Sequence, residues 1–182
     1  MRRTSAETKT IIRAAARERF AREGYDRTTI RAIAQDASID PSMVMRYFGS
    51  KEGLFAEAVD LDLRLPEVSE IPAADRGAAL AGHFVDRWED GDELLMILLR
   101  TAATNPAAAE RMRSVFADQL TPVVARLTGE PSEAPLRAGL IATQVLGLAL
   151  CRYTLDLPPV VQMSREQIID LVGPTLQRYL SR

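Results

Sequence analysis

The sequence has little of several residue types, and each scarcity excludes a class of protein. Its 182 residues contain one cysteine, Cys151, so an internal disulfide is impossible and a reducing cytoplasm is the compartment that fits best. The N-terminal stretch MRRTSAETK is not followed by an apolar run, so we expect no secretory signal. The longest apolar stretches, LLMILL and GLIATQVLGLALC, are too short to span a bilayer, so we expect no membrane protein.

The sequence also lacks the motifs that are typical of enzymes. It has one histidine, no His and Cys cluster with metal-ligand spacing, no G-x-S-x-G and no glycine-rich phosphate loop. Paired carboxylates in apolar surroundings are missing as well. We therefore expect no enzymatic activity, no metal and no cofactor.

Charge is unevenly distributed along the chain. The net charge is −2, but residues 1–51 carry eleven Lys or Arg against six Asp or Glu, whereas residues 52–182 carry twelve against nineteen. A basic end on an acidic body suggests that the basic end meets a polyanion such as nucleic acid. The alternative is ordinary variation of charge over a helical surface.

Apolar residues recur at helical spacing along the whole chain, so we predict an all-α fold. Thr4 and Glu7 have the spacing of a capping box and begin the first helix, which Gly24 ends. Thr28 or Thr29 then caps a second, short helix. These signals are local, and they predict where the two helices begin and where the first one ends.

The third helix has a clearly marked beginning and a short length. In the stretch IDPSMVMRYFGSKEGL, Asp40 is a good N-cap and Pro41 stands at the first helical position, where proline is favoured. Gly49 ends the helix after about two turns. Two short helices joined by a tight break at Ser38 and Ile39 form a helix-turn-helix, whose second helix enters the major groove of DNA.

The junction after the third helix has the features of a phosphate site. Tyr47 offers a hydroxyl group, and Ser50 and Lys51 stand at the N-terminus of the next helix. Free N–H groups and the helix dipole attract an anion there. Lys51 is one of only two lysines; the alternative is an ordinary solvated surface lysine.

At these residues the sequence resembles the TetR family of bacterial transcriptional regulators. The run TTIRAIAQDASIDPSMVMRYFGSKEGLF (28–55) has the family's Thr-Thr-Ile-x-x-Ile-Ala opening and its Tyr-Phe-Gly-Ser-Lys-Glu junction. Phe20, Gly24 and Tyr25 match the end of the family's first helix. The motifs cover about residues 8–59, and beyond them only the helical pattern and the length agree. The resemblance implies an all-helical homodimer whose N-terminal domain binds operator DNA and whose variable C-terminal domain binds a small ligand that relieves repression.

The resemblance also implies roles for single residues in DNA binding. It places one set of side chains at positions that touch bases and a second set at positions that touch phosphates. The base-contacting set is Arg31, Ser42, Met43, Met45 and Arg46, and the phosphate-contacting set is Thr29, Tyr47 and Lys51.

The third helix departs from the family at three positions. Lysine or glutamine is common at position 41, threonine or serine at 43 and tyrosine at 45, whereas this sequence has Pro41, Met43 and Met45. The helix therefore offers few hydrogen-bond donors. The methionines can pack on thymine methyl groups while Arg31 or Arg46 takes a guanine. The alternative for both methionines is packing against neighbouring helices.

The rest of the chain predicts five further helices. Their expected ranges are 75–90, 92–104, 106–128, 133–156 and 164–181. Pro122 and Pro174 should kink or shift the helices that contain them. We expect a helix-turn-helix domain (1–49), a connecting helix (50–65), and a helical domain for ligand binding and dimerisation (66–182).

Apolar stripes in these helices have two interpretations. Leu80, Phe84 and Trp88 recur at intervals of four residues. A helical bundle needs such stripes for its core, but some can instead line an apolar ligand cavity. For the polar candidates, the alternative is a surface or capping role. The candidate ligand-binding residues are His83, Phe84, Trp88, Met96, Arg100, Phe116, Gln144 and Arg152.

The last two long helices are expected to pair two copies of the chain. The first of them is rich in small residues, which let another helix approach closely, and both have more apolar surface than one chain needs to cover. The resemblance implies the same four-helix interface. Cys151 is expected to be a buried thiol. The expected interface residues are Ala142, Val145, Leu146, Ala149, Ile168, Val172 and Leu176.

Together these observations predict a cytoplasmic, ligand-responsive transcriptional regulator. It should act as a repressor that binds a palindromic duplex operator as a homodimer, is released by a small apolar or amphipathic molecule and has no membrane partner. Two other classes stay open at this point. An all-helical adaptor for protein binding is disfavoured by the basic N-terminal part, and a carrier of apolar ligands leaves the motif at 28–55 unexplained.

Overall fold

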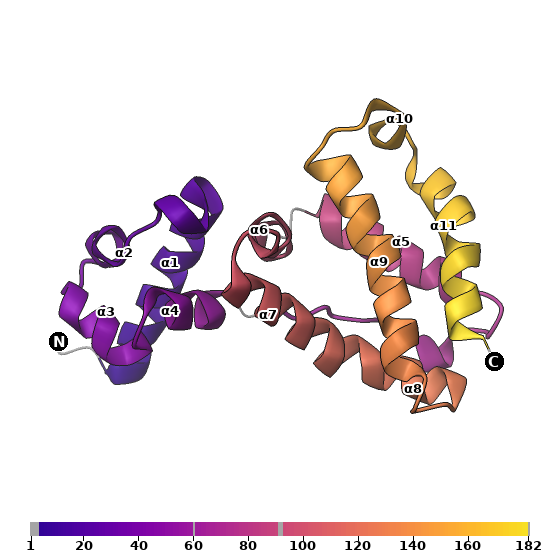
Figure 1. The fold of residues 1–182 in the computed structure, drawn as a ribbon, viewed down its shortest axis with the longest axis horizontal. Helices are drawn as coiled ribbons and strands as arrows, with labels where there is room; N and C mark the ends of the chain where they lie inside the picture. The colour runs from indigo at the N-terminus through magenta and orange to yellow at the C-terminus, as the bar shows by residue number, and fades with distance from the viewer. Residues whose placement is uncertain (1–3, 60, 91–92, 182) are drawn as a thin grey trace. The chain divides into compact units, whose positions relative to one another are not determined.

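The structure is a computed structural model that describes residues 4–59, 61–90 and 93–181. Residues 1–3 and 182, at the ends of the expected domains, lie outside the described residues. The chain forms two compact units, the first made of residues up to 61 together with 93–111, and the second of 62–92 and 112–182. Throughout the described residues every regular element is helical (Figure 1), and the predicted all-α fold is confirmed.

The first unit contains the helix-turn-helix. Its elements are α1 (Ser5–Arg27), α2 (Ile30–Ala37), α3 (Pro41–Phe48), α4 (Lys51–Ala58), α6 (Glu93–Ala102) and the first part of α7 (Pro106–Val115). This compact unit includes residues 93–111, which the expected division counts with 66–182, and the expected domain bounds stay a prediction.

The predicted caps of this unit form as hydrogen bonds. Thr4 and Glu7 make the capping box of α1, and the side chains of Thr29, Asp40 and Ser50 accept from backbone N–H groups of α2, α3 and α4. Gly24, at φ 76° and ψ 170°, interrupts the helical path of α1 before its last residues.

An aromatic cluster forms the core of the first unit. The Phe20 ring stacks on Tyr25 with 5.7 Å between centroids, and both rings lie nearly perpendicular to Phe55 with 5.0 Å between centroids. Ile12 and Ile33 are fully buried around it. The cluster joins α1 to α4, the two helices that flank the helix-turn-helix in the sequence.

The connecting helix is shorter than the sequence predicted. We expected it to run to residue 65, but α4 ends at Ala58. Its last carbonyl groups accept hydrogen bonds from two distant arginines, with 3.3 Å from Arg17 Nε to Ala58 O and 3.3 Å from Arg111 Nε to Val59 O. Residues 61–67 form no helix. Leu61 and Leu63 are buried, whereas Asp62 and Arg64 are exposed, so the side chains alternate between the interior and solvent.

The second unit is a helical bundle. Its elements are η1 (Val68–Glu70), α5 (Arg76–Glu89), the end of α7, η2 (Phe116–Leu120), α8 (Thr121–Thr128), α9 (Ala134–Tyr153), α10 (Pro158–Val161) and α11 (Arg165–Leu180). Helices α5 and α11 cross very closely, since a Cβ atom added to Gly77 would lie 2.4 Å from the Gly173 carbonyl oxygen. Asp86 and Arg165 add an ion pair between the same helices, with an Nε–Oδ1 distance of 2.5 Å.

The two prolines act differently. The expected helix 106–128 is divided, because η2 is a π-helical turn that leads into α8, and Pro122 lies in the first turn of α8. Proline lacks an N–H group and is tolerated in a first turn, which explains the break. Pro174 lies inside α11, which continues past it.

Among the described residues, α9 is the one helix long and apolar enough, by length and composition, to cross a membrane. The sequence predicted only shorter apolar stretches; the helix gains its length by including Arg137 and Arg152 near its ends. Helices that pack against other helices meet the same two criteria.

Candidate nucleic-acid interface

The turn between α2 and α3 is short and fixed by the backbone. Ser38 takes a left-handed conformation (φ 53°), and Ile39 N donates to Ala34 O at 2.9 Å. Asp40 Oδ1 then accepts from Ser42 N at 2.8 Å and begins α3. Val44 and Phe48 are buried, as predicted, so one face of α3 is held by the unit and the opposite face is directed outward.

The end of α3 is set by a close contact with α4. Gly49 has φ 74°, and a Cβ atom added to Gly53 would lie only 2.3 Å from the Phe48 carbonyl oxygen. Glycine at position 53 thus allows the first turn of α4 to touch the last turn of α3. The direction of α3 is therefore defined at both of its ends.

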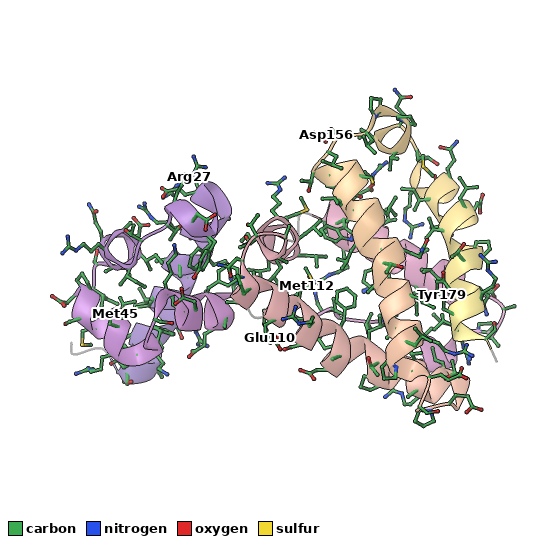
Figure 2. All side chains as sticks on the ribbon, in the orientation of Figure 1. Arg27, Met45, Glu110, Met112, Asp156 and Tyr179 are labelled. Carbon is green, nitrogen blue, oxygen red and sulfur yellow. The ribbon has the colours of Figure 1, made fainter. Side chains whose placement is uncertain are left out.

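The predicted base-contacting residues are mostly at the surface. Arg31, Ser42, Met45 and Arg46 are exposed, and Met43 is half-buried; Figure 2 shows Met45 at the outer side of α3. The Ser42 hydroxyl donates to Asp40 Oδ1 at 2.5 Å, and the Arg46 guanidinium lies 5.3 Å from the centroid of the Tyr47 ring. Two of the polar side chains on α3 thus already have partners within the unit.

The predicted phosphate-contacting residues lie around the helix ends. The Thr29 oxygen accepts from Ala32 N at 3.1 Å, which leaves its hydroxyl hydrogen available to a phosphate. Lys51 Nζ lies 3.3 Å from Asp26 O and 4.2 Å from the centroid of the Tyr25 ring. Lys51 is therefore positioned by the last turn of α1.

Tyr47 lies beside a cation that the sequence analysis did not single out. Lys9 Nζ is 6.0 Å from the centroid of Tyr47 and 5.7 Å from that of Phe48. Hydrogen bonds to Ser5 and to Arg46 lower the pKa of Tyr47. Lys9 is the other of the two lysines in the sequence. The scarcity of lysine is the feature that could have pointed to it.

An ion pair keeps an acidic residue of α2 neutralised. Arg19 donates from Nε to Asp36 Oδ2 at 2.5 Å and from Nη2 to Asp36 Oδ1 at 2.8 Å. The hydrogen bond to Arg19 is the main reason that the pKa of Asp36 is lowered. The pair ties α1 to α2 and reduces the negative field near the helix-turn-helix.

Two family descriptions match the chain. "Bacterial regulatory proteins, tetR family" matches residues 12–58, and "Tetracyclin repressor-like, C-terminal domain" matches residues 74–180. The chain belongs to the TetR family of bacterial regulatory proteins. It is a DNA-binding transcriptional regulator with a helix-turn-helix domain.

Solved structures of similar proteins agree with this assignment. A TetR-family regulator from Streptomyces coelicolor A3 is 27% identical over 98% of this chain and 97% of that one, with a TM-score of 0.64. A transcriptional regulator from Rhodococcus sp. Rha1 is 25% identical over 97% of this chain and 96% of that one, with a TM-score of 0.65. A TetR-like transcriptional regulator from Rhodococcus sp. RHA1 shares the fold at 21% identity, covering 98% of both chains with a TM-score of 0.63. The search of curated proteins found no matching sequence.

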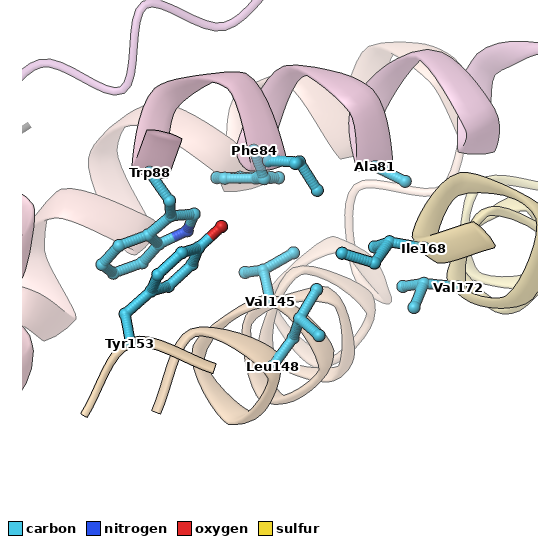
Figure 3. A pocket seen from close by; sticks show the side chains of 9 residues that line it. Ala81, Phe84, Trp88, Val145, Leu148, Tyr153, Ile168 and Val172 are labelled. Carbon is cyan, nitrogen blue, oxygen red and sulfur yellow. The ribbon is translucent and has the colours of Figure 1, made fainter. Parts of the chain in front are cut away.

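Two of the predicted ligand residues of this TetR-family regulator meet at one cavity within the second unit. Phe84 and Trp88 do meet, at an apolar cavity of about 10 Å³ between α5, α9 and α11 (Figure 3). Met96 and Arg100 belong to α6 in the first unit. Phe116 is buried in η2 and is not among the residues that line this cavity.

The other polar ligand candidates make contacts within the fold. His83 Nε2 lies 2.9 Å from the Leu63 carbonyl oxygen. Arg152 Nη1 donates to three main-chain carbonyls between residues 160 and 163, and its Nη2 pairs with Glu89 at 3.1 Å. Gln144 Nε2 lies 3.5 Å from the Thr143 hydroxyl. His83 and Arg152 thus bind main-chain carbonyl groups of other segments. This agrees with the surface or capping role that was the alternative to ligand binding.

The predicted dimer residues of the regulator mostly face its own core. Val145, Ala149, Ile168 and Leu176 are buried within the chain, so they are unavailable to a partner. Ala142, Leu146 and Val172 are half-buried, and so is Cys151, which we expected to be buried. The exposed apolar side chains of the last long helices are Leu136, Leu140 and Leu150 of α9 and Leu171 of α11.

Proposed function

We propose that this TetR-family regulator is a repressor that binds a palindromic operator as a homodimer and is released by a small molecule. The observation that carries its DNA-binding mode is the outward face of α3, with Ser42, Met45 and Arg46 exposed and Lys9 and Lys51 near its flanks. A helix of two turns fits into the major groove of DNA, where its outward face can contact the base edges. The lysines beside it can contact the phosphates. The proposed role needs no catalysis and no cofactor, and we place the protein in the cytoplasm, on the nucleoid when DNA is bound.

A dimer is supported by the uncovered apolar face of α9 and α11, which lie side by side (Figure 1). Leu136 and Leu171 are 67% and 68% exposed. Along α9, the exposed positions 136, 140, 143, 147 and 150 alternate steps of four and three residues, which is the spacing of a helix that packs along another. We therefore move the proposed interface from the predicted residues to Leu136, Leu140, Leu150 and Leu171.

A small-molecule site is supported by the indole of Trp88. The side chain is 6% exposed, and among the described residues its Nε1 has no hydrogen-bond partner. Figure 3 shows the Trp88 indole next to the Tyr153 ring at one end of the cavity, where the two rings stack with 5.8 Å between centroids. A buried donor without a partner costs about 1–3 kcal/mol, so an apolar ligand with one acceptor atom would gain from binding there.

The size of the cavity determines how such a ligand enters. A volume of about 10 Å³ is close to what one water molecule requires, roughly 10–15 Å³. A larger molecule fits only if the side chains of α5, α9 and α11 move apart. Ligand binding would then change the packing of the second unit, and it would weaken DNA binding if the repacked chain has the lower affinity for the operator.

DNA binding is tested with duplexes selected from a random pool by the native chain. We expect an enriched palindrome with half-sites one or more turns apart, about 34–36 Å per turn. The logarithm of the association constant for this duplex should fall linearly with the logarithm of the salt concentration. A pool without enrichment, or binding that salt does not weaken, would contradict the proposal.

Ligand binding is tested by fluorescence, because Trp88 is the only tryptophan. The native chain is titrated with a panel of apolar metabolites and drugs that carry a carbonyl group, with and without the selected duplex. A compound that lowers DNA affinity tenfold must itself bind about tenfold more weakly to the complex, about 1.4 kcal/mol, because coupling is reciprocal. Compounds that release DNA while leaving Trp88 fluorescence unchanged would place the ligand elsewhere.

A further inference from the structure

The outward face of α3 has an unusual chemical character for a surface that reads DNA. Met45 is 44% exposed, and it is the only large apolar side chain that is exposed among the described residues of the first unit. The other large apolar side chains described in this unit are buried or half-buried. The single uncovered one stands on the helix that enters the groove.

The polar neighbours of Met45 on α3 are engaged within the protein. The Ser42 hydroxyl donates to Asp40 at 2.5 Å, and hydrogen bonds from Ser42 lower the pKa of the Asp40 carboxyl, so the acceptor stays charged. The Arg46 guanidinium lies over the Tyr47 ring. The Ser42 hydroxyl group therefore already donates its hydrogen bond within the protein. Met45, in the middle of this face, can make an apolar contact with a base without breaking any of these interactions.

One group on a base edge in the major groove matches an apolar side chain. Thymine presents its C5-methyl group there, whereas the other bases present hydrogen-bond donors and acceptors. Methionine is unbranched and polarizable, so it adapts to such a methyl group better than a rigid side chain does.

We propose that Met45 reads the methyl group of one thymine in each operator half-site, and that this contact is a determinant of specificity. The inference rests on the proposed DNA-binding function and adds to it the identity of a base. It requires that replacing thymine by uracil, which removes only the methyl group and keeps the base pair, weakens binding at one position per half-site.

The test uses the duplex enriched from the random pool and replaces its thymines by uracil one position at a time. Burial of one methyl group corresponds to about a fourfold change in affinity per half-site, or about fifteenfold when both half-sites are changed. We expect this loss at one thymine of each half-site for the native chain. The Met45→Ala variant should bind the thymine and uracil duplexes equally.

Arg46→Ala provides the matched control, because it alters the next residue of the same helix. It should weaken binding to both duplexes and keep their ratio unchanged. Met45 is exposed, so its replacement should leave the fold intact, which circular dichroism checks; the uracil series on the native chain decides the question even without the variant. A half-site without thymine, a uracil series without effect, or an unchanged ratio in Met45→Ala would overturn the inference while DNA binding stands. Failure to enrich any duplex would overturn both.

Discussion

Tyr25 joins the core of the DNA-binding unit to its surface. Its ring packs on Phe20 and Phe55, its hydroxyl donates to Glu52 Oε1 at 2.8 Å, and the Lys51 ammonium lies over its face. A core residue thus positions a lysine that we assign to the phosphates. The stability of the unit and the geometry of its DNA-binding surface consequently depend on the same side chain.

The titration of Tyr25 gives a prediction about stability and pH. Burial, and next the hydrogen bond to Glu52, raise the pKa of Tyr25 to about 12. An unfolded tyrosine titrates near pH 10, so the protonated hydroxyl stabilises the fold fully below about pH 10, and this contribution is lost as the pH rises through about 12. We expect the free energy of unfolding to fall by about 2–3 kcal/mol over that window. Denaturant titrations of the native chain and Tyr25→Phe measure it; equal falls in both proteins would assign the effect to other groups.

Arg46 and Lys51 should have separable effects on DNA binding. Lys51→Ala should weaken binding to all duplexes alike and lower the salt slope by about one unit, because it removes one phosphate contact. Arg46→Ala should cost about 1–3 kcal/mol on the selected duplex and relax the base preference at one position. Fluorescence anisotropy at several salt concentrations distinguishes the two. Equal losses of specific and non-specific binding in both variants would show that the two roles are not divided in this way.

Between whole elements, the angle of α3 depends on close contacts at its ends. Gly53 lets α4 begin directly against the carbonyl of Phe48, and Asp40 starts α3 with a side-chain hydrogen bond. Neither contact involves Met45 or Arg46 on the exposed face that meets DNA. The orientation of α3 is thus set by contacts at its two ends, so the residues on its outer face can vary in sequence.

Gly53→Ala should therefore destabilise the protein although alanine is the better helix former. The new Cβ atom would lie 2.3 Å from the Phe48 carbonyl oxygen, so α3 or α4 must shift. Ala56→Gly, at an exposed position of the same helix, is the matched control and should cost about 1 kcal/mol from helix propensity alone. Thermal melts should show a larger loss for Gly53→Ala than for the control, together with weaker DNA binding. A variant as stable as the native chain would mean that the two helices have room to separate.

At the scale of the whole molecule, assembly depends on the outer face of α9 and α11. A charge in an apolar interface costs several kcal/mol, so Leu140→Glu and Leu171→Glu should each convert the dimer to a monomer. Both side chains are exposed in the single chain, so the fold should persist. Ala117→Glu, at an exposed position outside this face, should leave the dimer intact. Light scattering measures the mass; a native chain that is monomeric at micromolar concentration would contradict the proposed dimer.

The sequence by itself determined the helix-turn-helix. Its helix ends depend on hydrogen bonds between residues two to four positions apart, such as those of Thr4, Asp40 and Ser50, and on a backbone conformation that glycine at position 49 adopts easily. These interactions are local, so residue types at fixed spacing were enough to predict them. The buried anchors Val44 and Phe48 followed from the helical period in the same way.

Only the tertiary structure decided which apolar residues face inward and where the longer elements end. Val145 and Leu140 lie on the same helix and are both apolar, yet Val145 packs against α5 and α11 while Leu140 is exposed; periodicity marks apolar faces but not their partners. The end of α4 at Ala58 depends on Arg17 and Arg111, which come from distant parts of the chain. Such contacts join residues far apart in sequence, and their existence depends on how the helices pack, which no local pattern encodes.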